Sequence, residues 1–197
     1  MDKPSAPSCE RNREPILEVL RSHFADRQQV LEIGSGTGQH AVYFAAAMPS
    51  LRWQCTDRAE YLPGIHQWLD EAALPNTPAP FALDVAKLWP SGRYDAVFSA
   101  NTLHIMGWDE VERLFQQLPR STSNDAKLAI YGPFNYDGRY TSDSNAAFDE
   151  WLQARGEHMR IRDAEAVDVL AQVAGFELID DVAMPANNRL RIWQRER

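Results

Sequence analysis

The stretch that decides the fold is Val30-Leu31-Glu32-Ile33-Gly34-Ser35-Gly36-Thr37-Gly38-Gln39-His40. It predicts a short buried strand, a glycine turn and the start of a helix that continues to residue 47. Glycine has no Cβ, so each of these glycines lets the backbone take a positive φ and lets a ligand approach the main chain. The helix directs its unpaired N–H groups and the positive end of its dipole toward the turn. We therefore expect the turn to receive the polar part of a nucleotide-like or charged ligand.

The spacing of the glycines separates two classes of cofactor that use such a turn. The dinucleotide fingerprint is Gly-x-Gly-x-x-Gly/Ala, and counted from Gly34 its last small residue would stand where the chain has Gln39. The pattern present is Glu-x-Gly-x-Gly-x-Gly, from Glu32 to Gly38. That pattern resembles motif I of class I methyltransferases that use S-adenosylmethionine (SAM). A glycine-rich turn of some other α/β protein is the alternative, so the neighbouring strands must decide.

Length and composition predict a globular chain. Its 197 residues, 44% of them hydrophobic and 24% charged, suffice for one well-buried domain and are few for two. We expect one domain over 1–197, in which 1–27 supply a leader and a helix that packs on the core. The formal net charge of −8, without a run of basic residues, makes nucleic acid an unlikely partner.

Targeting and cysteine usage favour the cytoplasm. The sequence has no apolar run of membrane-spanning length and no signal-peptide core at its start. Cys9 and Cys55 lack the spacing of metal ligands and are expected to be reduced thiols. We therefore expect no metal and no membrane contact.

A helix is predicted before the glycine turn. We expect its first turn at 10–15, because proline and acidic residues favour that position. Its apolar face would be formed by residues that recur at helical spacing, which are Ile16, Leu17, Leu20 and Phe24.

Acidic residues follow the second and third predicted strands. The strand 51–56 ends at Asp57, about where a Rossmann-type domain places the carboxylate that binds a ribose. A turn or helix-cap aspartate is the plainer alternative. The strand 81–83 ends at Asp84 and Val85. In the methyltransferases that the chain resembles, an acidic residue here reaches the adenine amino group, and its apolar neighbour packs on the ring.

The fourth predicted strand, 95–100, leads into Asn101 and His104. Ligands of open parallel sheets bind beyond the carboxyl ends of the strands, so we expect both residues near the reactive group. His104 has a plainer alternative, which is hydrogen bonding within its loop or packing under the cofactor. The Asn/Asp-Pro-Pro-aromatic motif of many amino-group methyltransferases is absent from the sequence. Adenine-N6 and glutamine-type chemistry therefore lose support.

The segment 133–145 is aromatic and polar at once. Loops at this end of a sheet usually carry specificity, so we expect it to close over a small substrate, with a structural loop as the alternative. Helices are predicted before and after it, the last with Asp163 as its N-cap. Their ranges are 108–118, 146–152 and 164–174.

The remaining predicted strands are 127–132, 176–179 and 189–194. The stretch between the last two is too short for a helical crossover, so they should pair antiparallel. A parallel sheet that finishes in a β-hairpin is the methyltransferase arrangement and is unusual for NAD-binding domains.

Five blocks of sequence, at 10–17, 31–40, 99–105, 132–138 and 184–188, occur in an order typical of one family. In them the chain resembles the domain-of-unknown-function 938 family, the methyltransferase-like 26 group. The resemblance implies an α/β, Rossmann-like class I methyltransferase fold, a three-layer sandwich whose mostly parallel seven-stranded sheet ends in an antiparallel β-hairpin. It implies SAM as cofactor and S-adenosylhomocysteine as product, and it names no substrate.

The leading hypothesis is methyl transfer from SAM to a small-molecule acceptor. This chemistry needs alignment and exclusion of water, and it needs neither a metal nor a covalent intermediate. His104 is the first candidate base for a hydroxyl or amine acceptor, followed by Tyr131 and Asp137. The residues expected to bind the cofactor are Glu32, Gly34, Ser35, Gly36, Thr37, Gly38, Asp57, Asp84, Val85 and Asn101.

Two other functions stay open. One is a SAM-binding protein without catalysis that acts through a protein partner. The other is an NAD-dependent oxidoreductase, which Gln39 and the terminal hairpin disfavour. The residues do not determine the oligomeric state.

Overall fold

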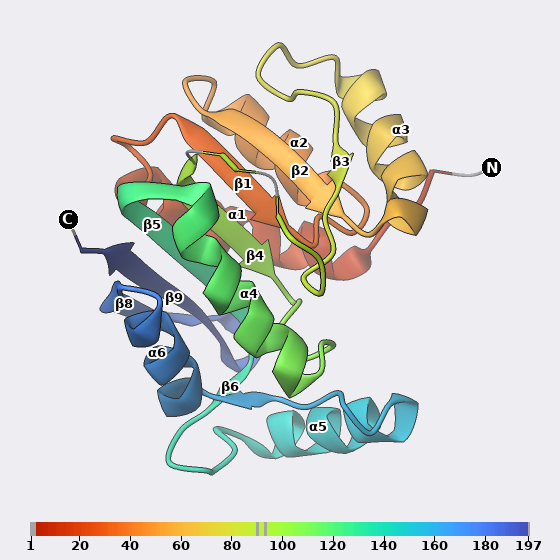
Figure 1. Cartoon of the computed structure of the whole chain (residues 1–197). Helices are drawn as coiled ribbons and strands as arrows, with labels where there is room; N and C mark the ends of the chain where they lie inside the picture. Colours follow the sequence, from red (N-terminus) through yellow and green to blue (C-terminus); the bar gives the residue numbers. More distant parts are fainter. Residues whose placement is uncertain (1–2, 90, 93, 197) are drawn as a thin grey trace.

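A seven-stranded sheet organises the computed structural model, which describes residues 3–89, 91–92 and 94–196. Its strand order is β3-β2-β1-β4-β5-β9-β8 (Figure 1). The first five strands in this order run parallel, and β9 pairs antiparallel with both β5 and β8. The strands are β1 Gln29–Ile33, β2 Arg52–Asp57, β3 Phe81–Ala82, β4 Tyr94–Ala100, β5 Thr122–Gly132, β8 Phe176–Met184 and β9 Asn188–Arg195. The predicted sheet and its terminal hairpin are confirmed.

Helices cover both faces of the sheet and make three layers (Figure 1). One face carries α1 Pro7–His23, α2 Gln39–Ala47 and α3 Leu62–Ala72, and the other carries α4 Trp108–Ser121 and α6 Ala164–Val173. A separate pair of short parallel strands, β6 Phe134–Asn135 and β7 Arg162–Asp163, is connected by α5 Asp143–Arg155. Short 3-10 turns occur at Ala59–Tyr61 and Pro185–Asn187. Within the described ranges, no helix combines the length and apolar character needed to cross a bilayer.

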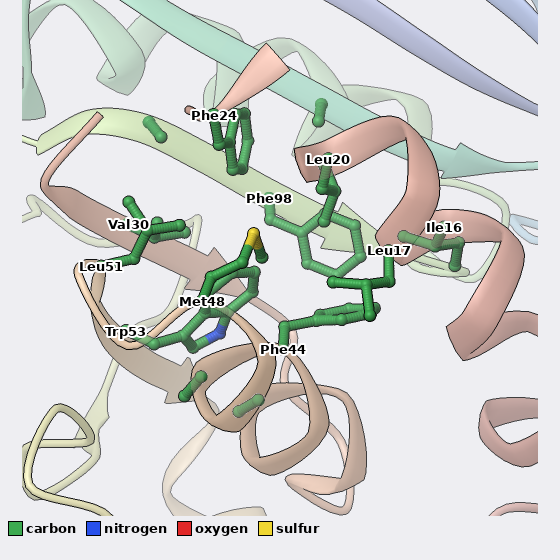
Figure 2. Packing of buried hydrophobic residues seen from close by; sticks show 14 of the residues in the cluster. Ile16, Leu17, Leu20, Phe24, Val30, Phe44, Met48, Leu51, Trp53 and Phe98 are labelled. Carbon is green, nitrogen blue, oxygen red and sulfur yellow. The ribbon is translucent and has the colours of Figure 1, made fainter. Parts of the chain in front are cut away.

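The core is divided between the two faces because successive residues of a strand point to opposite sides. Val30 belongs to the cluster under α1 to α3, whereas the next residue, Leu31, belongs to the cluster under α4 and α6. In the first cluster Phe44 and Phe98 pack with ring centroids 5.4 Å apart, and Trp53 lies beside both (Figure 2). Strands that are apolar on both faces are what a parallel sheet between two helix layers requires.

The first helix begins earlier than predicted. It starts at Pro7, with Ala6 as N-cap, so Pro15 lies inside the helix rather than in its first turn. The Ala6 N–H donates to Gln39 Oε1 at 2.6 Å, which fixes the start of α1 against α2. Pro15 removes one helical hydrogen bond. The predicted apolar face is buried, and each large side chain in it contributes roughly 2 kcal/mol, enough to offset that loss.

Four further elements differ from the sequence prediction by three residues or more at one or both ends. The helices α4 and α5 and the strands β5 and β8 all extend beyond their predicted ranges. Asp163 does occupy the N-cap position of α6, but its side chain makes no capping hydrogen bond. The extensions contain polar residues, whose ordering depends on contacts with distant parts of the chain rather than on local pattern.

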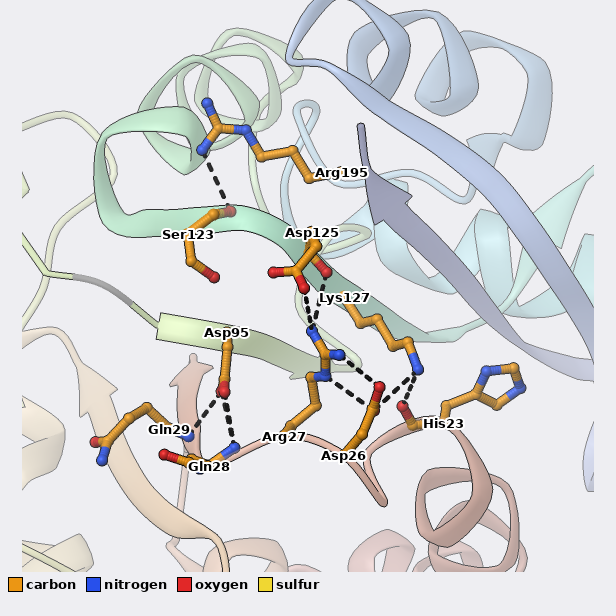
Figure 3. Close-up of polar contacts among 10 residues, drawn as sticks. All are labelled: His23, Asp26, Arg27, Gln28, Gln29, Asp95, Ser123, Asp125, Lys127 and Arg195. Atoms are coloured by element: carbon orange, nitrogen blue, oxygen red, sulfur yellow. Dashed lines mark hydrogen bonds and ion pairs between the residues drawn. The ribbon is translucent and has the colours of Figure 1, made fainter. Parts of the chain in front are cut away.

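The edge of the sheet where the parallel strands begin is fastened by polar contacts (Figure 3). The Asp95 carboxylate accepts the backbone N–H groups of Gln28, at 2.9 Å, and Gln29, at 2.7 Å. Arg27 donates to Asp26, and this hydrogen bond holds the pKa of the Asp26 carboxyl well below its usual range. These polar and charged groups pair with one another. The ligand site is therefore expected at the carboxyl ends of the parallel strands.

Candidate cofactor and active site

The glycine turn joins β1 to α2 at the carboxyl edge of the sheet. Gly34, Gly36 and Gly38 have φ of 72°, 58° and 90°. A Cβ on Gly34 would lie 2.8 Å from Thr102 Oγ1, so the turn and the loop after β4 can approach each other only because this residue is glycine. Gly38 is the N-cap of α2.

Glu32 and Ser35 support this turn from below. Glu32 is 2% exposed, and its Oε2 accepts the Ser35 hydroxyl and the Trp53 indole N–H, each at 3.0 Å. Burial raises the pKa of Glu32 to about 7, although both hydrogen bonds act in the opposite direction. The side chains of Glu32 and Ser35 thus orient the turn and do not line the cavity above it. The Thr37 hydroxyl likewise has a partner next to the turn, because it donates a hydrogen bond to Gln39 Oε1.

A cavity of about 480 Å³ lies beyond the carboxyl ends of β1 to β4. Most of the predicted cofactor residues come together in its wall. They are Gly34, Gly36, Asp57, Asp84, Val85 and Asn101.

Asp57 connects the end of β2 to the glycine turn. Its Oδ2 accepts the Gly36 N–H at 2.7 Å, and its Oδ1 accepts the Arg58 N–H at 2.7 Å. Burial raises the pKa of Asp57, and these backbone donors oppose that rise. The carboxylate is therefore held in one orientation at the cavity wall.

Asp84 lies in the wall of the same cavity, just beyond the strand that pairs with β2. Its Oδ1 accepts the Ala86 N–H at 2.9 Å, and its Oδ2 lies 3.6 Å from Lys87 Nζ. The adjacent Val85 side chain is buried. A carboxylate beside an apolar surface can recognise a flat heterocycle that carries an amino group.

Asn101 has a left-handed backbone, with φ of 56°, directly after β4. Its N–H donates to the carbonyl of Tyr131 at 2.8 Å. Asparagine tolerates this conformation better than most residues, and such strain concentrates at ligand sites. The conformation turns the chain out of the sheet where the cavity begins.

His104 is brought close to Asn101 but does not line the 480 Å³ cavity. Its ring is 7% exposed and packs edge-on against Phe148, with centroids 5.4 Å apart. Burial lowers the pKa of His104 to about 4, and the positive charge of Arg162 acts in the same direction. Neither ring nitrogen has a hydrogen-bond partner among the residues that the structure describes. The imidazole is thus neutral at neutral pH, and its unprotonated nitrogen can accept a hydrogen bond from a ligand.

The other two candidate catalytic residues differ in position. Tyr131 is buried near the end of β5, with the side-chain amides of Asn12 and Asn188 beside its hydroxyl, and burial raises its pKa. Asp137 lies on an exposed turn, where its N–H donates to Glu165 Oε1 at 3.2 Å. The structure therefore places Tyr131 close to the predicted site and leaves Asp137 outside the cavity wall.

Arg162 is a functional neighbour that the sequence reasoning missed. Its side chain is 8% exposed and donates to three backbone carbonyls, those of Leu103 at 3.2 Å, His158 at 2.9 Å and Met106. Met106 and His158 both line the cavity. Arg162 therefore joins the loop after β4 to the loop before β7, and no local pattern could have indicated this pairing.

A second missed group lies between α1 and α2. Asn12 Oδ1 is 2.7 Å from His40 Nε2, and both side chains are buried. Asn12 lies in the first of the five blocks and His40 in the second, and these blocks were the signal available. Across the described ranges, no three His, Cys, Asp or Glu side chains are grouped to hold a metal ion.

Comparison with known proteins gives a family and a fold. A family model described as "Protein of unknown function (DUF938)" matches residues 3–195. Among solved structures, an O-methyltransferase family protein from Burkholderia thailandensis superposes with a TM-score of 0.82 at 18% identity, over 93% of this chain and 56% of that one. The apo form of the SAM-dependent methyltransferase SibL gives 0.81 at 24% identity, over 96% and 56%.

A third similar structure is the mitomycin 7-O-methyltransferase MmcR, with a TM-score of 0.77 at 20% identity, over 87% of this chain and 50% of that one. The chain thus spans only about half the length of these proteins. At such identities the likeness establishes the fold, which is the Rossmann-like methyltransferase fold.

Proposed function

Because the chain belongs to the DUF938 family and has a methyltransferase fold, we propose that it transfers a methyl group from SAM to a small-molecule acceptor. The observation that carries this proposal is one cavity whose wall combines the glycine turn, the Asp57 and Asp84 carboxylates and Asn101.

The residues of this cavity fit SAM chemically. Its volume of about 480 Å³ falls within the range of cofactor sites. Asp57 offers a carboxylate to ribose hydroxyls, and Asp84 offers one to an adenine amino group. Val85 and Ile105 add apolar surface for a ring. The open space above Gly36, where a Cβ would meet nothing within 4 Å, admits the amino-acid part.

The protein's own contribution would be binding, alignment and exclusion of water. When bound, SAM supplies a methyl group on a positively charged sulfur, which leaves as the neutral thioether S-adenosylhomocysteine. The turn, held by Thr56 through two backbone hydrogen bonds of 3.0 Å, would fix the cofactor relative to the sheet.

His104 is the residue we propose as base. A hydroxyl or amine acceptor loses a proton on methylation, and a neutral imidazole without another partner can take it. The pKa of about 4 keeps His104 neutral at neutral pH but makes it a weak base, so it would take the proton as the new bond to the methyl group forms rather than before. The Tyr131 hydroxyl lies beside Asn12 and Asn188, and Asp137 lies on an exposed turn, so we do not propose either as the base. Because the similar structures include O-methyltransferases, hydroxyl acceptors are the first to screen.

Calorimetric titration with SAM, S-adenosylhomocysteine and NAD tests the proposal. We expect dissociation constants for the first two of about 1 μM, and no binding of NAD. Asp57→Ala should lower the affinities for SAM and S-adenosylhomocysteine by about tenfold or more, because the ribose and the glycine turn each lose a hydrogen-bond partner. Asp70→Ala, which removes an exposed carboxylate on α3, is the matched control. Absence of SAM binding, or equal affinity in Asp57→Ala and Asp70→Ala, would refute the assignment.

A further inference from the structure

A second cavity lies at the turn that joins β8 to β9. Its volume is about 370 Å³, enough for a small molecule and too small for a folded polymer. Its lining residues come from the segment after β5 and from the hairpin. They are Tyr136, Thr141, Ala183, Met184, Asn187, Asn188 and Arg189.

The two cavities are separated by the end of β5. In the sheet, Ala100 of the first cavity pairs with Tyr131, and the next residue, Gly132, pairs with Arg189 of the second. Two strand spacings, about 10 Å, therefore separate the walls of the two cavities. This distance is within the length of a small molecule bound beside a cofactor.

Gly132 lies on β5 between the two walls. A Cβ at this position would lie 3.7 Å from His104 Nδ1 and 3.9 Å from Asn101 Oδ1. The glycine is thus flanked by the unpartnered imidazole and by a residue of the first cavity. A Cβ there would make ordinary van der Waals contact with both groups, and a larger side chain would crowd them.

The charge of the second cavity is balanced. Arg189 is the one ionisable cation among its described lining residues, and its Nε donates to Asp181 Oδ1 at 2.7 Å. Its Nη2 donates to the Asp181 carbonyl at 2.7 Å. The Tyr136 hydroxyl also donates to Asp181, at 2.7 Å. An anionic ligand would have to compete with this carboxylate for Arg189, so the cavity favours uncharged ligands.

The polar side chains of the hairpin turn are partly engaged within the protein. Asn187 Nδ2 donates to Ser144 Oγ, and Asn188 Nδ2 donates to the Pro185 carbonyl, each at 3.1 Å. The Asn188 amide also lies beside the Tyr131 hydroxyl, whereas no donor to Asn187 Oδ1 occurs among the described residues. A ligand that supplies a hydroxyl or N–H hydrogen could bind at Asn187 Oδ1.

This turn is also held in a strained form. Ala186 and Asn187 have φ of 57° and 56°, in the left-handed region. Asn145, 5% exposed on α5, donates to the Asn187 carbonyl at 3.1 Å and fixes it. Strain that surrounding contacts maintain is characteristic of ligand sites.

We propose that this second cavity is the acceptor site and that it takes small, uncharged molecules bearing a hydroxyl or neutral amine. The inference rests on the proposed function, because the acceptor atom would have to extend past Gly132 to Asn101 and His104, which that function places beside the methyl donor. The apolar surfaces of Tyr136 and Met184 would hold the rest of the molecule.

Ligand-observed NMR on protein saturated with S-adenosylhomocysteine tests the ligand class. The neutral probes are benzyl alcohol and aniline, and the anionic ones are benzoate and phenyl phosphate. We expect the neutral probes to bind about tenfold more tightly than the anions. Ala183→Trp, an exposed position in the cavity wall, should abolish this binding, whereas Glu177→Trp, exposed on the same strand outside the wall, should not.

The position of the site is tested by nuclear Overhauser effects between probe and S-adenosylhomocysteine. We expect such effects in the unmodified protein and in Glu177→Trp, and their loss in Gly132→Leu, with S-adenosylhomocysteine kept at a saturating concentration for each variant. Equal probe binding in Ala183→Trp, a preference for the anions, or no effect between the two ligands would overturn the proposal. Failure to bind S-adenosylhomocysteine at all would instead refute the proposed function.

Discussion

At the scale of a single residue, Glu32 shows how a motif position can support the turn beneath a candidate cofactor cavity. The carboxyl group is buried beneath the glycines and hydrogen-bonded to Ser35 and Trp53. Its pKa rises from an ordinary 4.5 to about 7 on folding. A carboxyl group whose pKa is higher in the folded state than in the unfolded state favours folding when it is protonated, at low pH. This contribution to the unfolding free energy is lost as the pH rises from about 4.5 through 7.

Glu32→Gln should therefore gain stability relative to the unmodified protein as the pH rises. The amide oxygen still accepts both hydrogen bonds, and the difference in unfolding free energy should grow by about 3 kcal/mol between pH 4 and pH 8. Urea unfolding at several pH values measures it. The affinity for S-adenosylhomocysteine should stay within about twofold. A pH-independent difference would mean that Glu32 is not the titrating group.

At the scale of elements, the loops that close the cavity depend on Arg162. Its guanidinium binds carbonyls of Leu103, Met106 and His158, which lie in two loops far apart in the sequence. Arg162→Met leaves these carbonyls without donors, so unfolding free energy should fall by about 3 kcal/mol. Hydrogen exchange should accelerate in 103–106 and 156–161, and affinity for S-adenosylhomocysteine should fall. Arg160→Met, which removes an exposed side chain two positions away, is the control and should change none of these.

Elements also show what the sequence can predict. The glycine turn, Asp57 and Asp84 were predictable because each depends on residues a few positions away within one strand–turn unit. The predicted start of α1 was wrong, because the observed start depends on the hydrogen bond from Ala6 to Gln39 on another helix. The Arg162 contacts and the second cavity were missed for the same reason. They arise where segments separated by tens of residues meet, and no periodic pattern marks them.

At the scale of the whole molecule, two buried histidines on different elements make the fold sensitive to acid. His40 lies on α2 and His104 after β4, and burial lowers the pKa of each from 6.5 to about 4. As the pH falls, the unfolded chain therefore binds protons at these two histidines at a higher pH than the folded chain does. Stability is full above pH 6.5 and declines as the pH falls toward 4.

We expect these histidines together to lower the unfolding free energy by about 4 kcal/mol between pH 7 and pH 5. Urea unfolding at both pH values measures the decline. In the double variant His40→Gln/His104→Gln this part of the decline should disappear. A decline of unchanged size would assign acid sensitivity to other groups. The same measurement on His66→Gln, at an exposed position of α3, is the control.

The order of strands has a consequence for partial unfolding. β8 reaches the sheet only through β9, which follows it in sequence and lies between it and β5. If β9 detaches, β8 loses its partner in the sheet. Its exposed Leu178 and Ile179 then lie on a strand without a neighbour, a state open to chaperones and to aggregation. Release of one strand would thus release two.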